Sequence, residues 1–160
     1  MSEYEINIDT QAVIPIGPEK SKVIEGNRII IVNQPALKII DKSCRFFGSS
    51  YQGRFLGTKN LIGISHKAPI IIEETREIIF FPTNSPRQDN CAWISLRHLE
   101  NYKKHNNNRS VLKFSGGHLI NLDISYGTLD NQVLRATRLE ALLNKRIEEI
   151  EKKTKKTIFF

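Results

Sequence analysis

The stretch between Thr128 and Lys153 constrains the fold most, because it contains no glycine or proline and its apolar residues recur at intervals of three and four. This spacing predicts an amphipathic helix near residues 129–153, of about seven turns at ~3.6 residues each. The hydroxyl of Thr128 is expected to cap its start. A helix of this length either lies across a sheet or projects and pairs with a second copy. For the second arrangement, the candidate oligomerisation contacts are Leu139, Leu143, Ile147 and Ile150.

Short β-type runs make up much of the remaining sequence. They cover residues 4–8, 12–16, 28–33, 61–65, 69–72, 77–81, 91–94, 111–114 and 119–124. Glu25-Gly26-Asn27 is expected to turn one strand into the next, and Ser115-Gly116-Gly117 is typical of a hairpin. We therefore expect a mostly antiparallel sheet. The length of 160 residues and the apolar content of 39% are those of one domain, residues 1–160, with its own core.

Two further helices are expected. Pro35 near the first turn and Gly48 after the last apolar residue bound a basic helix near residues 36–47. Ser95 is expected to cap a short helix near residues 96–104. Its inward residues are Leu96, Leu99 and Tyr102. Together with the sheet, the three helices give an α+β fold.

The basic charge of the chain is concentrated in residues 36–72. The formal net charge is +7, and six of the basic residues lie between Lys38 and Lys67 with Asp41 as the one acid there, so this segment supplies five of the seven charges. Such a concentration favours a polyanionic partner, nucleic acid above all. The glycine-bearing stretch 48–54 fits either an ordinary turn or a site where phosphate approaches the backbone closely. The basic, amide-rich segment 103–109 fits a solvated connector or a secondary phosphate contact, and we favour the connector.

Other functional classes find little support in the residues. Cys44 and Cys91 lack the local spacing of a zinc site, and Ser65-His66 is not spaced as part of a known catalytic unit. We expect no enzyme activity, no metal and no cofactor. Trp93 is expected in the core rather than as a platform for stacking bases. The acidic first ten residues do not resemble a targeting peptide, and no run is long enough to span a membrane, so we expect a cytoplasmic protein. The basic end, residues 152–160, is expected to fray.

Several fragments occur together, in order and with matching gaps, between about residues 35 and 135. They are SCRFFGSSYQGR at 43–54, GT at 57–58, ISHKAPI at 64–70, FFPT at 80–83, CAWIS at 91–95, ISY at 124–126 and NQV at 131–133. With them the chain resembles the ComK family, the competence transcription factors of Gram-positive bacteria. Ala68 stands where the family tends to have a second proline, and Ala92 where it tends to have glycine. Family members also continue further past the last helix, with an aromatic-proline segment that we do not recognise here.

The resemblance implies a sequence-specific activator of competence genes that acts on DNA as dimers pairing into tetramers. Its implied target is AT-rich DNA contacted mainly through the minor groove, and RNA polymerase and a proteolytic adaptor are further implied partners. It would be cytoplasmic and associated with the nucleoid. An alternative is a shortened regulatory protein that pairs with a full-length relative without activating transcription itself.

Individual roles follow from residue type. A narrow AT minor groove has enhanced negative potential and attracts arginine, so Arg54 is assigned to groove insertion. The expected phosphate contacts are Lys38, Lys42, Arg45, Lys59 and Lys67, and the expected hydroxyl donors are Ser49, Ser50 and Thr58.

Overall fold

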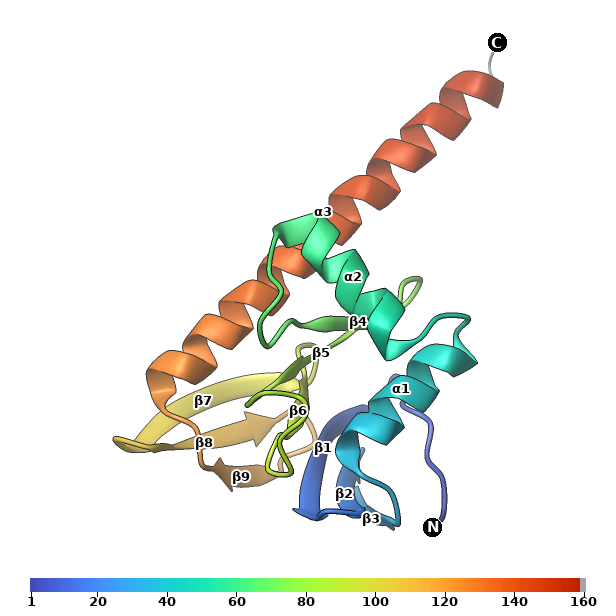
Figure 1. The fold of residues 1–160 in the computed structure, drawn as a ribbon. Coiled ribbons are helices and arrows are strands. Elements are labelled where there is room, and N and C mark those ends of the chain that lie inside the picture. The colour runs from blue at the N-terminus through green and yellow to red at the C-terminus, as the bar shows by residue number, and fades with distance from the viewer. Residues whose placement is uncertain (159–160) are drawn as a thin grey trace.

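The chain forms two antiparallel sheets and three helices (Figure 1). The computed structural model describes residues 1–158. The strands are β1 (Thr10–Gly17), β2 (Lys20–Glu25), β3 (Arg28–Val32), β4 (Ile70–Glu73), β5 (Ile78–Pro82), β6 (Trp93–Ser95), β7 (Leu99–Asn106), β8 (Arg109–Phe114) and β9 (Leu119–Leu122), and the helices are α1 (Ala36–Phe46), α2 (Tyr51–Ile62) and α3 (Tyr126–Ile158). The larger sheet has the order β3-β2-β1-β6-β5-β4, and the smaller one has the order β7-β8-β9.

Strand β6 joins the two halves of the larger sheet. It pairs with β1 through Ala12 and Ile94, and with β5 through Phe81 and Ile94. The chain therefore leaves the sheet at one edge, after β3, and returns at the opposite edge with β4. The helices α1 and α2 make this crossing, which places the basic segment over one face of the sheet.

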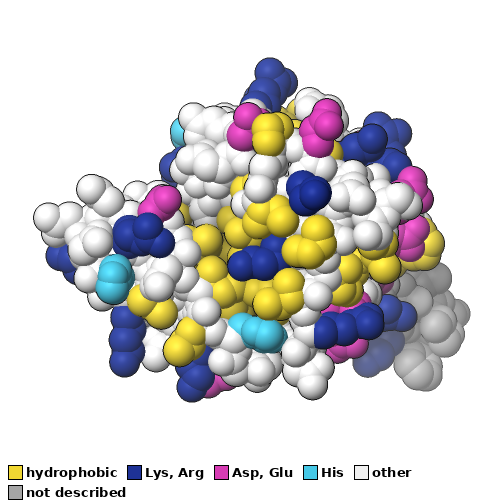
Figure 2. Space-filling view, turned by 90° about the horizontal axis from the view of Figure 1, so that it is seen from below, with side chains coloured by type: hydrophobic (Ala, Val, Ile, Leu, Met, Phe, Trp, Pro, Cys, Tyr) yellow, Lys and Arg dark blue, Asp and Glu magenta, His cyan; other side chains and the backbone are white. Residues whose placement is uncertain are grey.

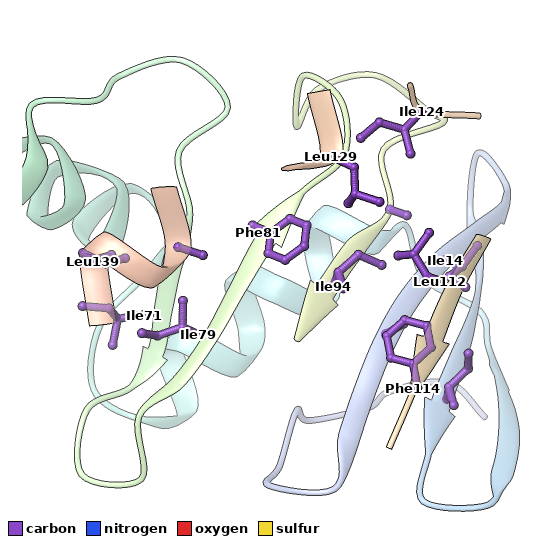
Figure 3. Close-up of a cluster of buried hydrophobic side chains, with 14 of the residues drawn as sticks. Ile14, Ile71, Ile79, Phe81, Ile94, Leu112, Phe114, Ile124, Leu129 and Leu139 are labelled. Carbon is purple, nitrogen blue, oxygen red and sulfur yellow. The ribbon is translucent and has the colours of Figure 1, made fainter. Parts of the chain in front are cut away.

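The larger sheet separates two hydrophobic cores. Phe80 and Phe81 are adjacent on β5 and both fully buried, yet Phe80 packs with α1 and Phe81 packs with α3 and the smaller sheet. Figure 3 shows Phe81 beside Ile94 and Leu129 in the second core. Because successive side chains of a strand point to opposite faces, a strand covered on both faces must be apolar throughout. This explains the continuous apolar run at residues 78–81.

Most of the expected elements are confirmed. The fold is α+β with mostly antiparallel strands, α1 lies within the expected range 36–47, and the last helix begins at Tyr126. That helix continues to Ile158 rather than fraying after residue 152, while Phe159 and Phe160 of the expected frayed end lie outside the described residues. Trp93 is fully buried, as expected. None of the helices within residues 1–158 is long and apolar enough to cross a lipid bilayer.

The expected helix near residues 96–104 is wrong, because this segment forms β7. The pairing of β7 with β8 shifts register between Leu99 and Asn101, so two steps on β7 match one step on β8. Such a bulge lets Leu99 and Tyr102, three residues apart, face the same core. Their spacing therefore imitates a helical period.

Two other predicted strands are wrong, and two elements of the structure were not predicted. Residues 61–65, expected as a strand, contain the end of α2 and the loop after it. Helix α2 was not expected, because Gly53 and Gly57 lower its propensity and its apolar residues do not gather on one face. Residues 4–8 form no strand, although Tyr4 and Ile6 are buried, and β2 is a strand that was not expected.

Candidate nucleic-acid interface

Helices α1 and α2 meet at a tight, fully hydrogen-bonded corner. Gly48 has a φ of 87°, the amide of Gly48 donates to the Arg45 carbonyl at 3.0 Å, and the amide of Ser49 donates to the Cys44 carbonyl at 2.9 Å. These two bonds are the C-terminal motif that glycine makes possible at the end of a helix. Ser50 then caps α2, its Oγ accepting from the Gly53 amide at 3.0 Å. The stretch 48–54 is therefore a helix–helix corner, and its serines are partly committed to the fold.

Asp41 links the two helices. Its Oδ1 accepts from the Tyr51 amide at 2.9 Å, and its Oδ2 accepts from Arg45 Nε at 2.8 Å. Burial raises the pKa of the Asp41 carboxyl, but the Tyr51 amide and the Arg45 guanidinium outweigh burial, so the pKa lies below its ordinary value. The ionised carboxylate thus fixes the first turn of α2 against α1.

Three of the six predicted cationic residues are in ion pairs. Arg45 pairs with Asp41 on the same helix, Lys42 Nζ lies 2.8 Å from Glu3 Oε1, and Arg54 Nη1 lies 2.6 Å from Glu74 Oε1. Glu3 and Glu74 lie outside the basic segment of the sequence. The fold therefore lowers the positive potential of this segment below what its composition indicates.

Arg54 is the most enclosed of these cations, with its side chain 17% exposed. Its Nε is buried and has no hydrogen-bond partner among the described residues. Arg54 is therefore held at the surface by Glu74 and does not project freely from it.

Thr58 is fully buried, and its Oγ1 donates to the Pro69 carbonyl at 2.6 Å. This hydroxyl fixes α2 to the start of β4 and does not reach solvent. The assignment of Thr58 as a phosphate donor is therefore corrected: its role in this structure is to anchor the helix.

Lys38, Lys59 and Lys67 have no ion-pair partner within residues 1–158. Lys38 and Lys59 are exposed on α1 and α2, and Lys67 is half-buried in the loop that follows α2, with a φ of 49°. The carbonyl of Lys67 accepts from Gln132 Nε2 at 2.9 Å, which ties this loop to α3. These three lysines are the part of the predicted site that is available to an anion.

A hollow of about 270 Å³ adds residues that the sequence analysis did not single out. It brings Lys67 together with His66 and with Arg87 from the loop before β6. Its other lining residues are Tyr51, Gln52, Phe55, Ser65, Ser85 and Pro86. The side chains of lysine, arginine and histidine beside two serines match the groups that contact phosphate and sugar in DNA complexes. The signal in the sequence was the pair of short polar segments, residues 65–67 and 85–87, which only the fold brings together.

The expected oligomerisation stripe divides into two parts. Leu139 and Leu143 are buried against the larger sheet, and Ile147 is half-buried against the same core. Ile150 is 63% exposed on the part of α3 that projects from the body of the molecule (Figure 1). Leu139 and Leu143 therefore contact the chain's own core, and only the end of the stripe near Ile150 is open to a second copy.

The two cysteines are free and buried. Burial raises the pKa of the Cys44 thiol to about 12 and that of the Cys91 thiol to about 11. Within residues 1–158, no cluster of three or more histidine, cysteine or acidic side chains is arranged to hold a metal ion. The environment of Cys44 and Cys91 is that of inert core thiols.

Comparisons with known proteins agree with the resemblance carried by the sequence fragments. The family model described as ComK protein matches residues 1–148. The competence transcription factor of Bacillus subtilis (strain 168) is 40% identical over 151 residues, which cover 92% of this chain and 79% of that protein. No solved structure matches the chain. The matched residues include both sheets, the corner between α1 and α2, and Lys38, Lys59 and Lys67.

Proposed function

The chain belongs to the ComK family, and on this premise we propose that it is a sequence-specific DNA-binding transcription activator of competence genes. The observation that carries the proposal is the 40% identity to a competence transcription factor along nearly the whole chain. The net charge of +7 and the exposed lysines of α1 and α2 support a polyanionic partner. We propose a regulator and not an enzyme.

The proposed DNA surface is formed by the exposed side of α1 and α2 and by the loops beside it. Lys38, Lys59 and Lys67 contact phosphates, and His66 and Arg87 contribute through the hollow that they share with Lys67. Ser49 and Ser50 lie at the corner between the helices and add hydroxyls at its edge. Lys42 and Arg45 contribute when phosphate replaces their carboxylate partners.

The proposed target is AT-rich DNA, read mainly through the minor groove. A narrow AT groove concentrates negative potential, and an inserted arginine gains most from it. Arg54 is the proposed inserting residue, in which case it exchanges Glu74 for the groove.

We further propose that the protein acts on DNA as a homodimer or a tetramer. The open region for self-association is the projecting end of α3 around Ile147 and Ile150. Leu139 and Leu143 pack the preceding part of α3 against the core.

The test is a binding titration of the purified chain on an AT-rich duplex and on a GC-rich duplex of equal length, at several salt concentrations between about 50 and 200 mM. We expect preference for the AT-rich duplex, and a log–log salt slope of about −0.9 for each phosphate contact. Several contacts give a slope of about −3 or steeper. A slope near zero contradicts DNA binding, whereas a steep slope without AT preference contradicts sequence specificity alone.

A further inference from the structure

The smaller sheet has one buried face and one open face. Leu112 and Phe114 are fully buried, and Tyr102 Oη donates to Asp130 Oδ1 of α3 at 2.6 Å. The register places Lys103 opposite Val111, and Lys113 opposite Leu119, on the other face. Leu119 is 68% exposed there. Figure 1 shows β7 and β8 extending away from the larger sheet to a free tip. We call residues 99–114, which contain β7, β8 and their turn, the β-arm.

The β-arm and β9 together carry strong positive charge. Residues 99–122, which comprise the β-arm and β9, contain one acid, Glu100, and four basic residues. The basic residues are Lys103, Lys104, Arg109 and Lys113. Four positive charges minus one negative charge give this stretch a net charge of +3. In Figure 2 several lysine and arginine side chains stand on the lobe at the left, where Figure 1 places the β-arm.

Two of these cations are free. Arg109 Nη1 lies 2.9 Å from Asp123 Oδ1, and Lys113 Nζ lies 3.6 Å from Glu100 Oε1. Lys103 and Lys104 are exposed and have no ion-pair partner in the described part of the chain. Because they are adjacent on one strand, their ammonium groups point to opposite faces of the arm. Positive charge on both faces suits a two-stranded β-ribbon that lies between the two phosphate backbones of a duplex.

The tip of the β-arm offers neutral donors next to these lysines. Residues His105, Asn106, Asn107 and Asn108 are all exposed. The amide of Asn108 donates to Asn106 Oδ1 at 3.0 Å, a local bond typical of asparagine turns. This bond orders the turn before any partner arrives, while the Asn107 side chain stays free to donate to a phosphate oxygen.

The loop at residues 83–90 borders β9 of the smaller sheet on one side and the hollow that contains Lys67 on the other. Asn84 and Asn90 line a hollow of about 180 Å³ together with Asn121 of β9. Arg87 of the same loop lines the hollow that contains Lys67. One polar loop therefore borders both the smaller sheet and the hollow that contains Lys67.

We propose that the β-arm is a second DNA-binding element, in which Lys103 and Lys104 contact the phosphate backbone of the duplex that the α1–α2 surface binds. This rests on the proposed function, and it replaces the interpretation of residues 103–109 as a connector. The partner is duplex DNA because phosphate complements an arm whose four basic residues outnumber its one acid, Glu100, and whose free lysines lie on both faces. The contact is to the backbone, so the arm supplies affinity and not base preference.

The test compares K103Q/K104Q with the matched control K155Q/K156Q, which removes two adjacent exposed lysines at the far end of α3. We expect the arm variant to lose about tenfold or more in DNA affinity and to weaken the log–log salt slope by about 1.8, since each phosphate contact contributes about 0.9. The ratio of AT-rich to GC-rich affinity stays unchanged, as does the circular dichroism spectrum. The control keeps the affinity and slope of the unmodified protein.

The outcomes separate the arm from the proposed function. If the unmodified protein binds AT-rich DNA and the arm variant matches it in affinity and slope, the arm proposal is overturned and the proposed function stands. If the unmodified protein binds no DNA, both are overturned. If the variant loses AT preference together with affinity, the arm reads bases and the backbone assignment is wrong.

A proximity measurement gives an independent test. Cys44 and Cys91 are buried with raised pKa values, so the N107C variant presents one reactive thiol for an iron chelate that cleaves nearby DNA. We expect cleavage confined to a few nucleotides beside the AT-rich site. Absence of cleavage, with binding retained, places the arm tip away from DNA and overturns the proposal.

Discussion

Arg54 Nη1 donates to Glu74 Oε1 across 2.6 Å, and this bond ties the first turn of α2 to the turn between β4 and β5. Arg54 is enclosed while Glu74 is 57% exposed, so the carboxylate is the partner that a phosphate group can displace. Ion pairs at a protein surface contribute about 1 kcal/mol or less, so a phosphate group can compete with Glu74 for the guanidinium. We therefore interpret this ion pair as the resting state of Arg54, meaning its state in the absence of DNA.

Glu74→Gln is expected to raise DNA affinity. The substitution removes the competing carboxylate and a negative charge near DNA, and it is worth about 1 kcal/mol, or about fivefold in affinity. Glu151→Gln, on the projecting part of α3, makes the same change in charge away from Arg54 and is expected to have little effect. Fluorescence anisotropy titrations at one salt concentration measure both. Equal gains from the two variants indicate a general charge effect, which contradicts a resting state.

Arg54→Ala and Arg87→Ala are both expected to weaken DNA binding. We expect a loss of about 1–3 kcal/mol for Arg54, as for a specific groove contact, and about 1 kcal/mol for Arg87, as for a phosphate contact. Arg87 belongs with the site because it shares a hollow with Lys67. Arg146→Ala on α3 is the control, with circular dichroism as the check on folding. Equal affinities for the Arg54 and Arg146 variants contradict the groove assignment.

Elements whose apolar residues follow a single periodicity were predicted correctly, and elements whose spacing the fold alters were not. The continuous apolar stripe predicted α3 correctly, and Pro35 and Gly48 marked the bounds of α1. The register shift after Leu99 made a strand look helical, and the glycines of α2 made a helix look like a turn. Local sequence also could not reveal the pairing of Arg54 with Glu74, because twenty residues separate them.

The basic surface shows the same limit. Composition located the positive charge, but the ion pairs that neutralise half of the predicted cations join α1 and α2 partly to acids outside the segment. The loop that carries Arg87 lies beside Lys67 only in the folded chain. Contacts over long sequence separations therefore decided which cations stayed free.

Asp41→Ala is expected to destabilise the α1–α2 corner. It removes the acceptor for the Tyr51 amide and the pair with Arg45, which together contribute about 1–2 kcal/mol to the free energy of unfolding. Asp41→Asn keeps an oxygen for the Tyr51 amide and is expected to cost about half as much. Urea denaturation at neutral pH measures the difference. Identical stability of the alanine and asparagine variants contradicts a role for this hydrogen bond.

The contribution of Asp41 depends on pH with a defined sign. Its pKa is lowered in the folded state, so its stabilisation is complete above the unfolded pKa of about 3.9 and is lost as the pH falls through the lower folded value. The difference in the free energy of unfolding between the unmodified protein and Asp41→Asn should stay constant from about pH 7 to pH 5 and disappear below about pH 4. A difference that widens in acid contradicts the direction of the shift.

Leu143→Asp and Ile150→Asp are expected to separate the core from the self-association region. Leu143 is 7% exposed and belongs to the core, so an aspartate there costs at least about 3 kcal/mol and is expected to unfold the protein. Ile150 is exposed, so its change leaves stability within about 0.5 kcal/mol. Sedimentation of the Ile150→Asp variant then measures its oligomeric state. Ile150→Asp that stays folded with an unchanged oligomeric state rejects the end of α3 as the interface.

Base-analogue exchange tests the groove. Replacing A·T pairs of a bound site with inosine·cytosine pairs alters the pattern of donors and acceptors in the major groove and removes the thymine methyl, while the minor groove keeps its acceptors and gains no amino group. A minor-groove reader is therefore expected to retain most of its affinity. Changing the same pairs to G·C adds the guanine amino group to the minor groove and is expected to cost about 1–3 kcal/mol for each critical pair. The K103Q/K104Q variant should show the same two responses at lower overall affinity, because the β-arm contacts phosphates that both exchanges leave in place. If inosine·cytosine abolishes binding as completely as G·C does, the protein reads the major groove, and Arg54 has another role.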